Sequence, residues 1–291
     1  MSILPVIVNP AARGGRAAPP REDLARTASA RGWKLEWWET NGVGHAAELA
    51  ARAARDGYPQ VAAWGGDGTY NEAARGLAGS DCALLVLPGG TTSVLAYELG
   101  VSRRPAHALA QLLEGKRREM ALARTDRGQL FLLMLSVGPD SVILTNLTPE
   151  RKARGGKLGI TRQAFVEFAR GGLPRFEVGL DGRRFEVSWC IVGNSRCYGG
   201  PYHATPGADP FAPGLETVIL RRHGRAAAVP FFFAIRFGLH LRLPGVDRLA
   251  ATEVVLSGSE GIPYQLDGDP AGFLPVTAHA TTERMWVVVP R

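Results

Sequence analysis

The chain has 291 residues, of which 45% are hydrophobic and 21% charged, a balance typical of a soluble globular protein with one large or two ordinary domains. This composition excludes a fibrous or disordered chain. The formal net charge of +7 favours anionic partners such as polyphosphate or an acidic membrane, although an ordinary arginine-rich surface is an equal alternative. No basic run alternates with aromatic residues, so nucleic acid is not expected as a partner.

The cysteines and the apolar stretches indicate a cytoplasmic protein. The number of cysteines is odd and their spacing fits no metal site, so we expect Cys82, Cys190 and Cys197 to be buried, reduced thiols. The first residues lack a basic leader and a cleavage site, which predicts a strand. The longest apolar stretch starts at Val229 and is interrupted at Arg236, too soon to span a bilayer. Any membrane contact is therefore expected to be peripheral.

Strand and helix patterns alternate along the first 124 residues. Apolar strands are predicted at 3–8, 34–38, 61–64 and 83–87, and helices around 24–28, 45–55 and 92–99. This repetition predicts a parallel sheet with helices on its faces. Ligands of such sheets bind beyond the carboxyl ends of the strands.

Short strands dominate the rest of the chain. They are predicted at 130–137, 175–187, 189–192, 217–220, 253–256, 276–280 and 286–289, with a hairpin turn at Asp181-Gly182. Helices are predicted at 161–170 and 229–241, and a basic loop at 151–157. The predicted fold is α/β plus β: a parallel-sheet nucleotide-binding domain at 1–124 and a β-sandwich-like domain at 125–282. For the last strand, at about 283–291, membership in the sheet of the first domain is left open.

A glycine-rich string, Gly65 to Glu72, follows the third predicted strand. Gly65, Gly66 and Gly68 let the backbone approach a ligand and direct its N–H groups at phosphate oxygens. Thr69 is expected to cap the next helix, whose N-terminus favours an anion. Asp67 is expected to act through Mg²⁺ on the phosphates of a nucleotide. An ordinary strand-to-helix turn is the alternative, which the full string disfavours.

A second loop, 88–93, repeats this pattern after the fourth strand. Gly90 permits close approach, and Thr91 offers a hydroxyl to a phosphate or to a helix end. Taken alone, the loop indicates a capped helix start. Together with the first loop, it favours one shared nucleotide site.

These loops and five other motifs, in this order, resemble the diacylglycerol kinase catalytic-domain family, which includes bacterial lipid kinases and the related sphingosine and ceramide kinases. The resemblance covers nearly the whole chain. The other five are Asn9-Pro10 with Gly14-Gly15-Arg16, Glu39-Thr40 with Gly44-His45-Ala46, Ser136 to Ser141, Gly193-Asn194 through Asp209, and Leu266-Asp267-Gly268-Asp269.

The resemblance implies an ATP-dependent kinase that phosphorylates a hydroxyl of a lipid such as diacylglycerol or a sphingoid base, in a cleft between its domains. It implies that Asp267 is the general base and Asp67 the second catalytic residue, with Mg²⁺ reached through Asp67. Without the resemblance, Asp267-Gly268 would indicate only a turn. The implied ATP contacts are Asn9, Thr40, Gly65, Gly66, Asp67, Gly68, Thr69, Asn71, Glu72, Gly90, Thr91 and Asp269. The expected partners are the lipid and, peripherally, an anionic membrane, and a homodimer is left open.

Departures from the family pattern keep two other hypotheses open. Ser93-Val94 replaces Asn-Asp, Ala121 replaces a frequent Asp, and Pro213 lies in a loop that helps to hold a structural metal in some members. These changes favour a nucleotide-binding regulator with weak or no kinase activity, and no second metal site is carried over. A kinase of a soluble substrate such as NAD is the third hypothesis.

The phenylalanines between 231 and 237 and three histidines are given structural roles. Phe231, Phe232, Phe233 and Phe237 are expected to pack a helix into the core, with a lipid-facing surface as the alternative. Capping or packing is the expected role of His45, His203 and His240, since their spacing fits no metal site.

Overall fold

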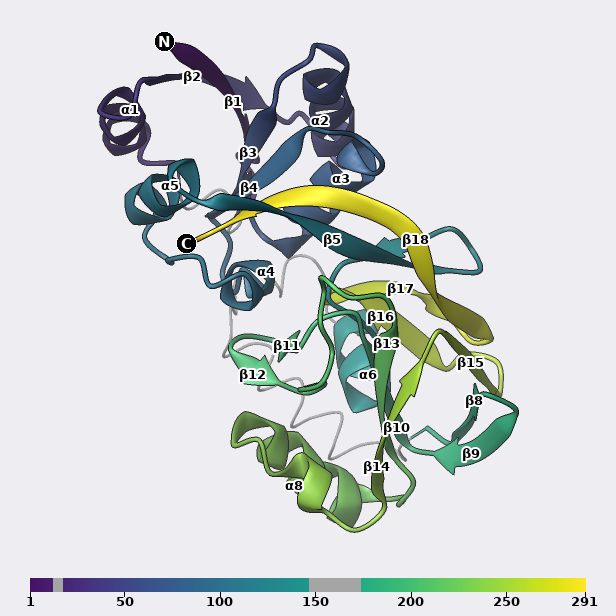
Figure 1. Cartoon of the computed structure of the whole chain (residues 1–291). Helices are drawn as coiled ribbons and strands as arrows, with labels where there is room; N and C mark the ends of the chain where they lie inside the picture. The colour runs from purple at the N-terminus through teal and green to yellow at the C-terminus, as the bar shows by residue number, and fades with distance from the viewer. Residues whose placement is uncertain (13–17, 147–173) are drawn as a thin grey trace. The chain divides into compact units, whose positions relative to one another are not determined.

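The computed structural model describes residues 1–12, 18–146 and 174–291 (Figure 1). The chain divides into two compact units, one made of 1–122 and 282–291 and the other of 123–281. Three predicted features lie outside the described residues: the glycine motif at 14–16, the basic loop at 151–157 and the helix at 161–170.

The first unit is a parallel sheet with the strand order β2-β1-β3-β4, to which the end of β18 adds in parallel, with Val287 opposite Leu84. The strands are β1 (Ser2–Val8), β2 (Trp33–Glu39), β3 (Gln60–Gly65), β4 (Ala83–Pro88) and β18 (Val276–Val289). The helices are α1 (Arg21–Ser29), α2 (His45–Arg55), α3 (Asp67–Leu77), α4 (Val94–Glu98) and α5 (Pro105–Leu113). Every residue of β4 is buried, as is usual for a parallel strand covered on both faces.

Helices α2 and α3 pack against each other, and α1 packs against α5. On α2 the apolar side chains Leu49, Ala50 and Ala53 are buried, which is the face that the 3.6-residue period brings together. The two helices approach closely at Gly76 of α3, because a Cβ there would overlap the carbonyl oxygen of Ala47.

The second unit is an antiparallel sandwich. One sheet has the order β14-β13-β10-β7-β16-β17, and the strands that face it are the first part of β18, then β15, β8 and β9. The shared core contains Val192, Ile219 and Tyr264 from the first sheet, together with Val178, Leu256 and Ala278 from the second. The strands are β7 (Met134–Val137), β8 (Phe176–Leu180), β9 (Arg183–Val187), β10 (Trp189–Gly193), β13 (Leu215–Leu220), β14 (Val246–Ala251), β15 (Glu253–Gly258), β16 (Pro263–Leu266) and β17 (Asp269–Phe273).

The remaining elements connect or cover these sheets. Strand β5 (Lys116–Thr125) pairs with β6 (Leu130–Phe131), and both β5 and β18 contribute residues to the two units. A short hairpin, β11 (Cys197–Tyr198) and β12 (Tyr202–His203), packs against α8 (Arg225–Arg236). The others are α6 (Pro139–Thr145) and the 3₁₀ turn η2 (His240–Arg242).

The predicted fold class is confirmed, as are several of its parts. The second helix spans the predicted His45–Arg55, and the predicted hairpin turn is present, with φ angles of 49° at Asp181 and 77° at Gly182. All three cysteines are buried free thiols, and burial raises the pKa of Cys82 to about 11. In the described ranges no helix is long and apolar enough to cross a bilayer.

Four predicted elements differ from the structure. The strand predicted at 130–137 is interrupted at Leu132 and Leu133, which separate β6 from β7. The two strands predicted at 276–280 and 286–289 form the single strand β18, because polar residues in its middle continue the extended backbone. The helix predicted at 229–241 is shifted towards the N-terminus and ends in a separate turn, η2. Strand β14 and helices α5 and α6 were not predicted.

Neighbouring valines of β15 offer a test of the sandwich core. Val254 is 0% exposed inside the core, whereas Val255 is 39% exposed on the other face. Val254→Ala should lower the free energy of unfolding by about 2 kcal/mol, since it removes two buried methyl groups and leaves a cavity. Val255→Ala, the matched control, should cost less than about 1 kcal/mol. Urea denaturation measures both, and equal losses would contradict the assigned faces.

Candidate functional site

The first glycine loop is held to the end of β1 by a side-chain hydrogen bond. The Asn9 Nδ2 atom donates to the Thr69 Oγ1 atom at 3.0 Å, and the Asn9 backbone N–H donates to the Trp64 carbonyl at 3.2 Å. Helix α3 has Gly66 as its N-cap and no side-chain cap, so the expectation that Thr69 caps this helix is wrong. Thr69 instead lies in the first turn, where its hydroxyl is taken up by Asn9.

The second glycine loop lies directly on the first. The N–H groups of Gly89 and Gly90 both donate to the Gly65 carbonyl, at 2.8 and 2.7 Å. A Cβ at position 90 would lie only 2.6 Å from the Gly66 Cα atom, so glycine is required for the two backbones to touch. The buried Tyr70 hydroxyl, within 2.9 Å of the Gly65 and Leu87 carbonyls, closes the arrangement. The two loops therefore form a single backbone cradle.

The Asp67 carboxylate joins the cradle to α4. Its Oδ2 atom accepts the Val94 N–H at 2.9 Å and its Oδ1 atom accepts the Leu95 N–H at 3.0 Å. Asp67 thus supplies the acceptors for the start of a helix whose own N-cap, Ser93, has a left-handed φ of 48° and makes no side-chain cap bond. Val94 takes part through its backbone, so the departure from the family's Asp leaves this contact intact.

A pocket of about 260 Å³ opens at the carboxyl ends of β1 and β2. Its lining includes Asn9, Thr40 and Glu72, three of the predicted nucleotide contacts. The Glu72 Oε2 atom also accepts the Ala46 N–H at 3.2 Å, which fixes the start of α2 beside the pocket. Because ligand pockets usually measure about 300–1,000 Å³, this one has room for part of a nucleotide.

The other predicted contacts of this unit differ in accessibility. Gly68 and Thr91 are exposed, whereas the Asn71 side chain is buried and accepts a hydrogen bond from Arg75 at 3.1 Å. Sequence reasoning missed Arg103, whose guanidinium donates to the carbonyls of Thr91 and Thr92 at 3.3 and 2.9 Å. No sequence motif indicated Arg103, because it is positioned by backbone carbonyl groups, which every residue type has. It places a cation beside the second loop.

The carboxylates near the glycine loops fit a metal ion that arrives bound to a nucleotide better than a metal ion bound by protein side chains alone. In the part of the chain that the structure describes, no three His, Cys, Asp or Glu side chains are placed to hold a metal ion. Mg²⁺ commonly uses one or two carboxylates together with substrate phosphates. Asp67 is the carboxylate that the cradle offers for this purpose.

In the second unit, Asp267 occupies the turn between β16 and β17. Its φ of 52° and that of Gly268, 92°, are both left-handed, as in a tight hairpin turn. The carboxylate accepts the N–H groups of Leu132, Leu133 and Met134 at 2.8, 2.8 and 3.0 Å. These bonds account for the interruption between β6 and β7, because the amides turn towards the carboxylate. Asp269 follows as the exposed first residue of β17.

A buried carboxylate supports this turn from behind. The Asp140 Oδ2 atom accepts the Tyr198 hydroxyl at 2.9 Å and the Gln265 side-chain amide at 3.3 Å. Gln265 in turn accepts the Gly268 N–H at 2.7 Å. Burial raises the pKa of Asp140, although the hydrogen bonds oppose this effect. Sequence reasoning placed Asp140 in a motif but gave it no role.

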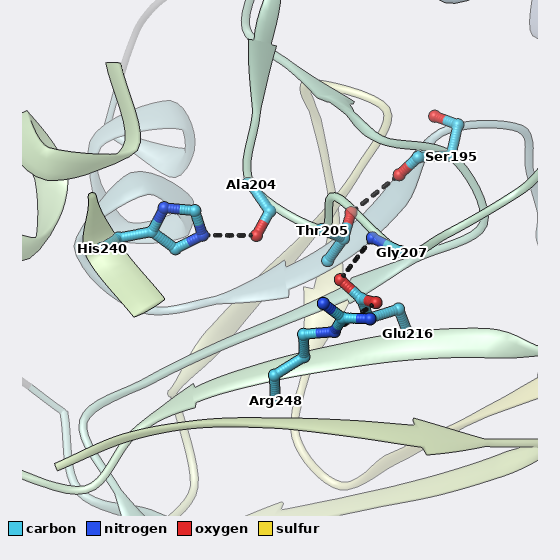
Figure 2. Close-up of polar contacts among 7 residues, drawn as sticks. All are labelled: Ser195, Ala204, Thr205, Gly207, Glu216, His240 and Arg248. Carbon is cyan, nitrogen blue, oxygen red and sulfur yellow. Dashed lines mark hydrogen bonds and ion pairs between the residues drawn. The ribbon is translucent and has the colours of Figure 1, made fainter. Parts of the chain in front are cut away.

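The loop from Asn194 to Asp209, another of the matched motifs, is fixed by buried polar groups (Figure 2). The buried Glu216 carboxylate accepts the Gly207 N–H at 3.0 Å and pairs with Arg248 at 2.9 Å. A Cβ on Gly207 would lie 2.1 Å from the Glu216 Oε2 atom and 2.4 Å from the Arg248 Nη2 atom, so a larger residue there would displace the ends of these two side chains. The His240 Nε2 atom donates to the Ala204 carbonyl at 2.9 Å. His240 thus packs in the core, as predicted.

Comparisons with known proteins agree with this architecture. Residues 4–125 match the model of the diacylglycerol kinase catalytic domain, and residues 134–289 match the YegS C-terminal NAD kinase beta sandwich-like domain. A Pseudomonas putida protein named "Probable lipid kinase YegS-like" is 31% identical over 82% of this chain and 80% of its own. A Mycobacterium tuberculosis diacylglycerol kinase is 28% identical over 84% and 82%. A Bacillus anthracis crystal structure, 20% identical, shares the fold with a TM-score of 0.79 over 99% and 95%.

These matches make the chain a kinase-family protein of two units. The chain belongs to the diacylglycerol kinase family, whose members include the YegS-like lipid kinases. Its predicted site residues lie in both units. Those from Asn9 to Thr91 belong to the first unit, and Asp267 and Asp269 belong to the second.

Replacing Asp67 should destabilise the protein even without nucleotide. Asp67→Asn leaves one side-chain oxygen for two α4 N–H groups and removes the charge, so the free energy of unfolding should fall by about 1–3 kcal/mol. Asp56→Asn is the matched control. It breaks only an exposed pair with Arg52 and should cost less than about 1 kcal/mol. Denaturant unfolding of the nucleotide-free protein measures both, and wild-type stability of Asp67→Asn would contradict the capping role.

The buried His240 should make folding stability depend on pH. Burial lowers the pKa of His240 below its ordinary 6.5. Among the described residues, no acceptor lies within hydrogen-bond distance of its Nδ1 atom, which would carry the second proton. The unfolded chain therefore binds that proton more readily, so stability is lost as the pH falls from about 7 to 5. His240→Gln should flatten this slope of the unfolding free energy. The comparison at pH 8, where the ring is neutral in both states, is the control, and an unchanged slope would show that another group titrates.

Proposed function

We propose that this kinase transfers the γ-phosphate of ATP to a hydroxyl of a lipid such as diacylglycerol or a sphingoid base. The observation that carries the proposal is the double glycine cradle joined by Asp67, in a chain whose second unit holds a fixed carboxylate at Asp267. Both features belong to motifs shared with the lipid kinase family. Phosphoryl transfer needs little more than such positioning, charge neutralisation and a base near the attacking oxygen.

The first unit supplies the nucleotide contacts in this proposal. Asn9, Thr40 and Glu72 face one part of ATP from the pocket, and the exposed start of α3 at Gly68 directs helix N–H groups and a positive dipole end towards its phosphates. Gly65, Gly66, Gly90 and Thr91 complete the cradle. Mg²⁺ bound to the phosphates and to Asp67 would neutralise charge on the transferred group.

Asp267 is the proposed base. As the alcohol oxygen forms its bond to the γ-phosphorus, the bond to the bridging oxygen breaks and ADP leaves, while the alcohol proton passes to the Asp267 carboxylate. Three backbone N–H donors keep that carboxylate from rotating away. The same hydrogen bonds occupy acceptor positions on both carboxylate oxygens. A test of Asp267 must therefore separate its role as a proton acceptor from its role in holding the backbone.

The lipid acceptor is supported by the relatives, named diacylglycerol kinase and lipid kinase. A soluble acceptor such as NAD is the second candidate, because the model that matches the second unit is described as NAD kinase-like. A weakly active regulator is the third, since Ala121, buried in β5, and Pro213, before β13, depart from the family pattern described above. Transfer of radiolabel from ATP to diacylglycerol, a sphingoid base or NAD, each offered alone, distinguishes the three.

Asp267→Asn should lower kcat by about 10²-fold or more and remove the acidic limb of the pH–rate profile, because an amide accepts no proton. Asn194→Ala is the matched control. It deletes the hydrogen bond to the Leu132 carbonyl, loosening the same turn while leaving the carboxylate. That variant should lose rate but keep the acidic limb. An Asp267→Asn enzyme with the wild-type pH profile would assign Asp267 a positioning role alone.

A further inference from the structure

Large apolar side chains are exposed along one short stretch of the second unit. Of the ten such residues exposed in the described chain, five lie between 229 and 239. They are Val229 (37%), Phe232 (39%), Phe233 (57%), Phe237 (69%) and Leu239 (44%). The other five are spread over both units. A cluster of this kind on a soluble chain usually marks an interaction surface. We call the five residues from Val229 to Leu239 the α8 patch.

Val229, Phe232 and Phe233 lie on the outer side of α8, whose inner side is packed, and Phe237 and Leu239 follow the end of this helix. Phe231 and Ile235 of α8 are buried, and the Phe231 ring lies edge-on to Trp189 with 5.2 Å between the ring centroids. The expectation of core packing is therefore confirmed for Phe231 and wrong for Phe233 and Phe237. Phe232 is 39% exposed but also stacks on Trp189, with 6.3 Å between the ring centroids. A surface helix normally turns polar side chains outwards, so an apolar outer face needs a partner.

The chain segment that carries the patch has charges of one sign. From Thr217 to Val246 the sequence contains no Asp or Glu, but it contains Arg221, Arg222, Arg225, Arg236 and Arg242. Two carboxylates of other strands reach this region: Asp247 pairs with Arg221 at 2.6 Å, and Glu186 contacts His223 at 3.2 Å. Within the described ranges, Arg222, Arg236 and Arg242 form no ion pair. Arg236 donates to the Tyr202 hydroxyl and lies over its ring.

We propose that the α8 patch inserts into the headgroup region of an anionic phospholipid membrane, with its phenyl rings among the acyl chains and the surrounding arginines at the lipid phosphates. Exposed aromatic residues beside basic residues are the composition of interfacial helices. A second copy of this chain fits less well, because a symmetric contact through the patch would bring two sets of arginines together. The inference stands on the chemistry of this surface and goes beyond the proposed reaction, so either can fail alone.

The experiment measures binding of the whole protein to vesicles by co-sedimentation, without nucleotide. Vesicles of phosphatidylcholine alone are compared with vesicles that also contain phosphatidylglycerol. The double variant Phe233→Ser/Phe237→Ser should bind the anionic vesicles at least about tenfold more weakly, because two exposed rings no longer leave water. Arg242→Gln should weaken binding about fivefold, and only to the anionic vesicles, since each arginine near such a surface contributes about 1 kcal/mol.

Phe273→Ser is the control for loss of an exposed aromatic ring elsewhere in the unit, since Phe273 is 48% exposed on β17, outside the patch. It should bind vesicles like the wild type. Thermal unfolding shows whether each variant is folded. We expect all variants to be folded, because the replaced side chains are exposed. The proposal is overturned if the double variant binds anionic vesicles as the wild type does. It is also overturned if light scattering shows a wild-type dimer that the double variant converts to a monomer.

Discussion

The bonds between the Asp267 carboxylate and the N–H groups of residues 132–134 fix the geometry of the second unit's site. They bring a hairpin turn late in the chain onto the start of β7, more than a hundred residues earlier in sequence. Because β16 also pairs with β7, the turn and the strand it caps share one register. Asp140 and Gln265 support the same turn from the buried side. The Asp267 carboxylate is thus held by the backbone of the unit itself.

The first unit uses the same device at Asp67. There, too, an aspartate in a glycine-containing turn accepts two backbone N–H groups of a segment that follows later, here the start of α4. The short aspartate side chain suits this purpose because few rotamers need to be frozen. In both places the residue expected to take part in chemistry also holds the backbone together. Loss of activity after its replacement therefore has two physical causes, which stability measurements and pH profiles separate.

The elements that were predicted correctly are those whose conformation depends on residues close together in the sequence. Helix α2 and the hairpin at Asp181-Gly182 follow from side-chain period and turn chemistry within a few residues. The break at Leu132 could not be predicted from its own apolar neighbourhood, because its cause is the distant Asp267. Thr69 was expected to cap α3, but it lies in the first turn and its hydroxyl accepts a long-range hydrogen bond from Asn9. The apolar run around Phe233 has the same composition as a buried helix, and the burial of Phe231 and Ile235 in the structure shows which side faces inwards.

The course of β18 has a consequence for how the protein is made. This strand begins in the sandwich and ends beside β4, so the last strand of the first unit leaves the ribosome only after the whole second unit. Until then, the edge of β4 that pairs with β18 lacks this partner in the nascent chain. The segments that form the two glycine loops have by that time already been synthesised. Unpaired edges of this kind are sites of association between chains. The N-terminal sheet can therefore be completed only after the C-terminal half of the chain has been synthesised.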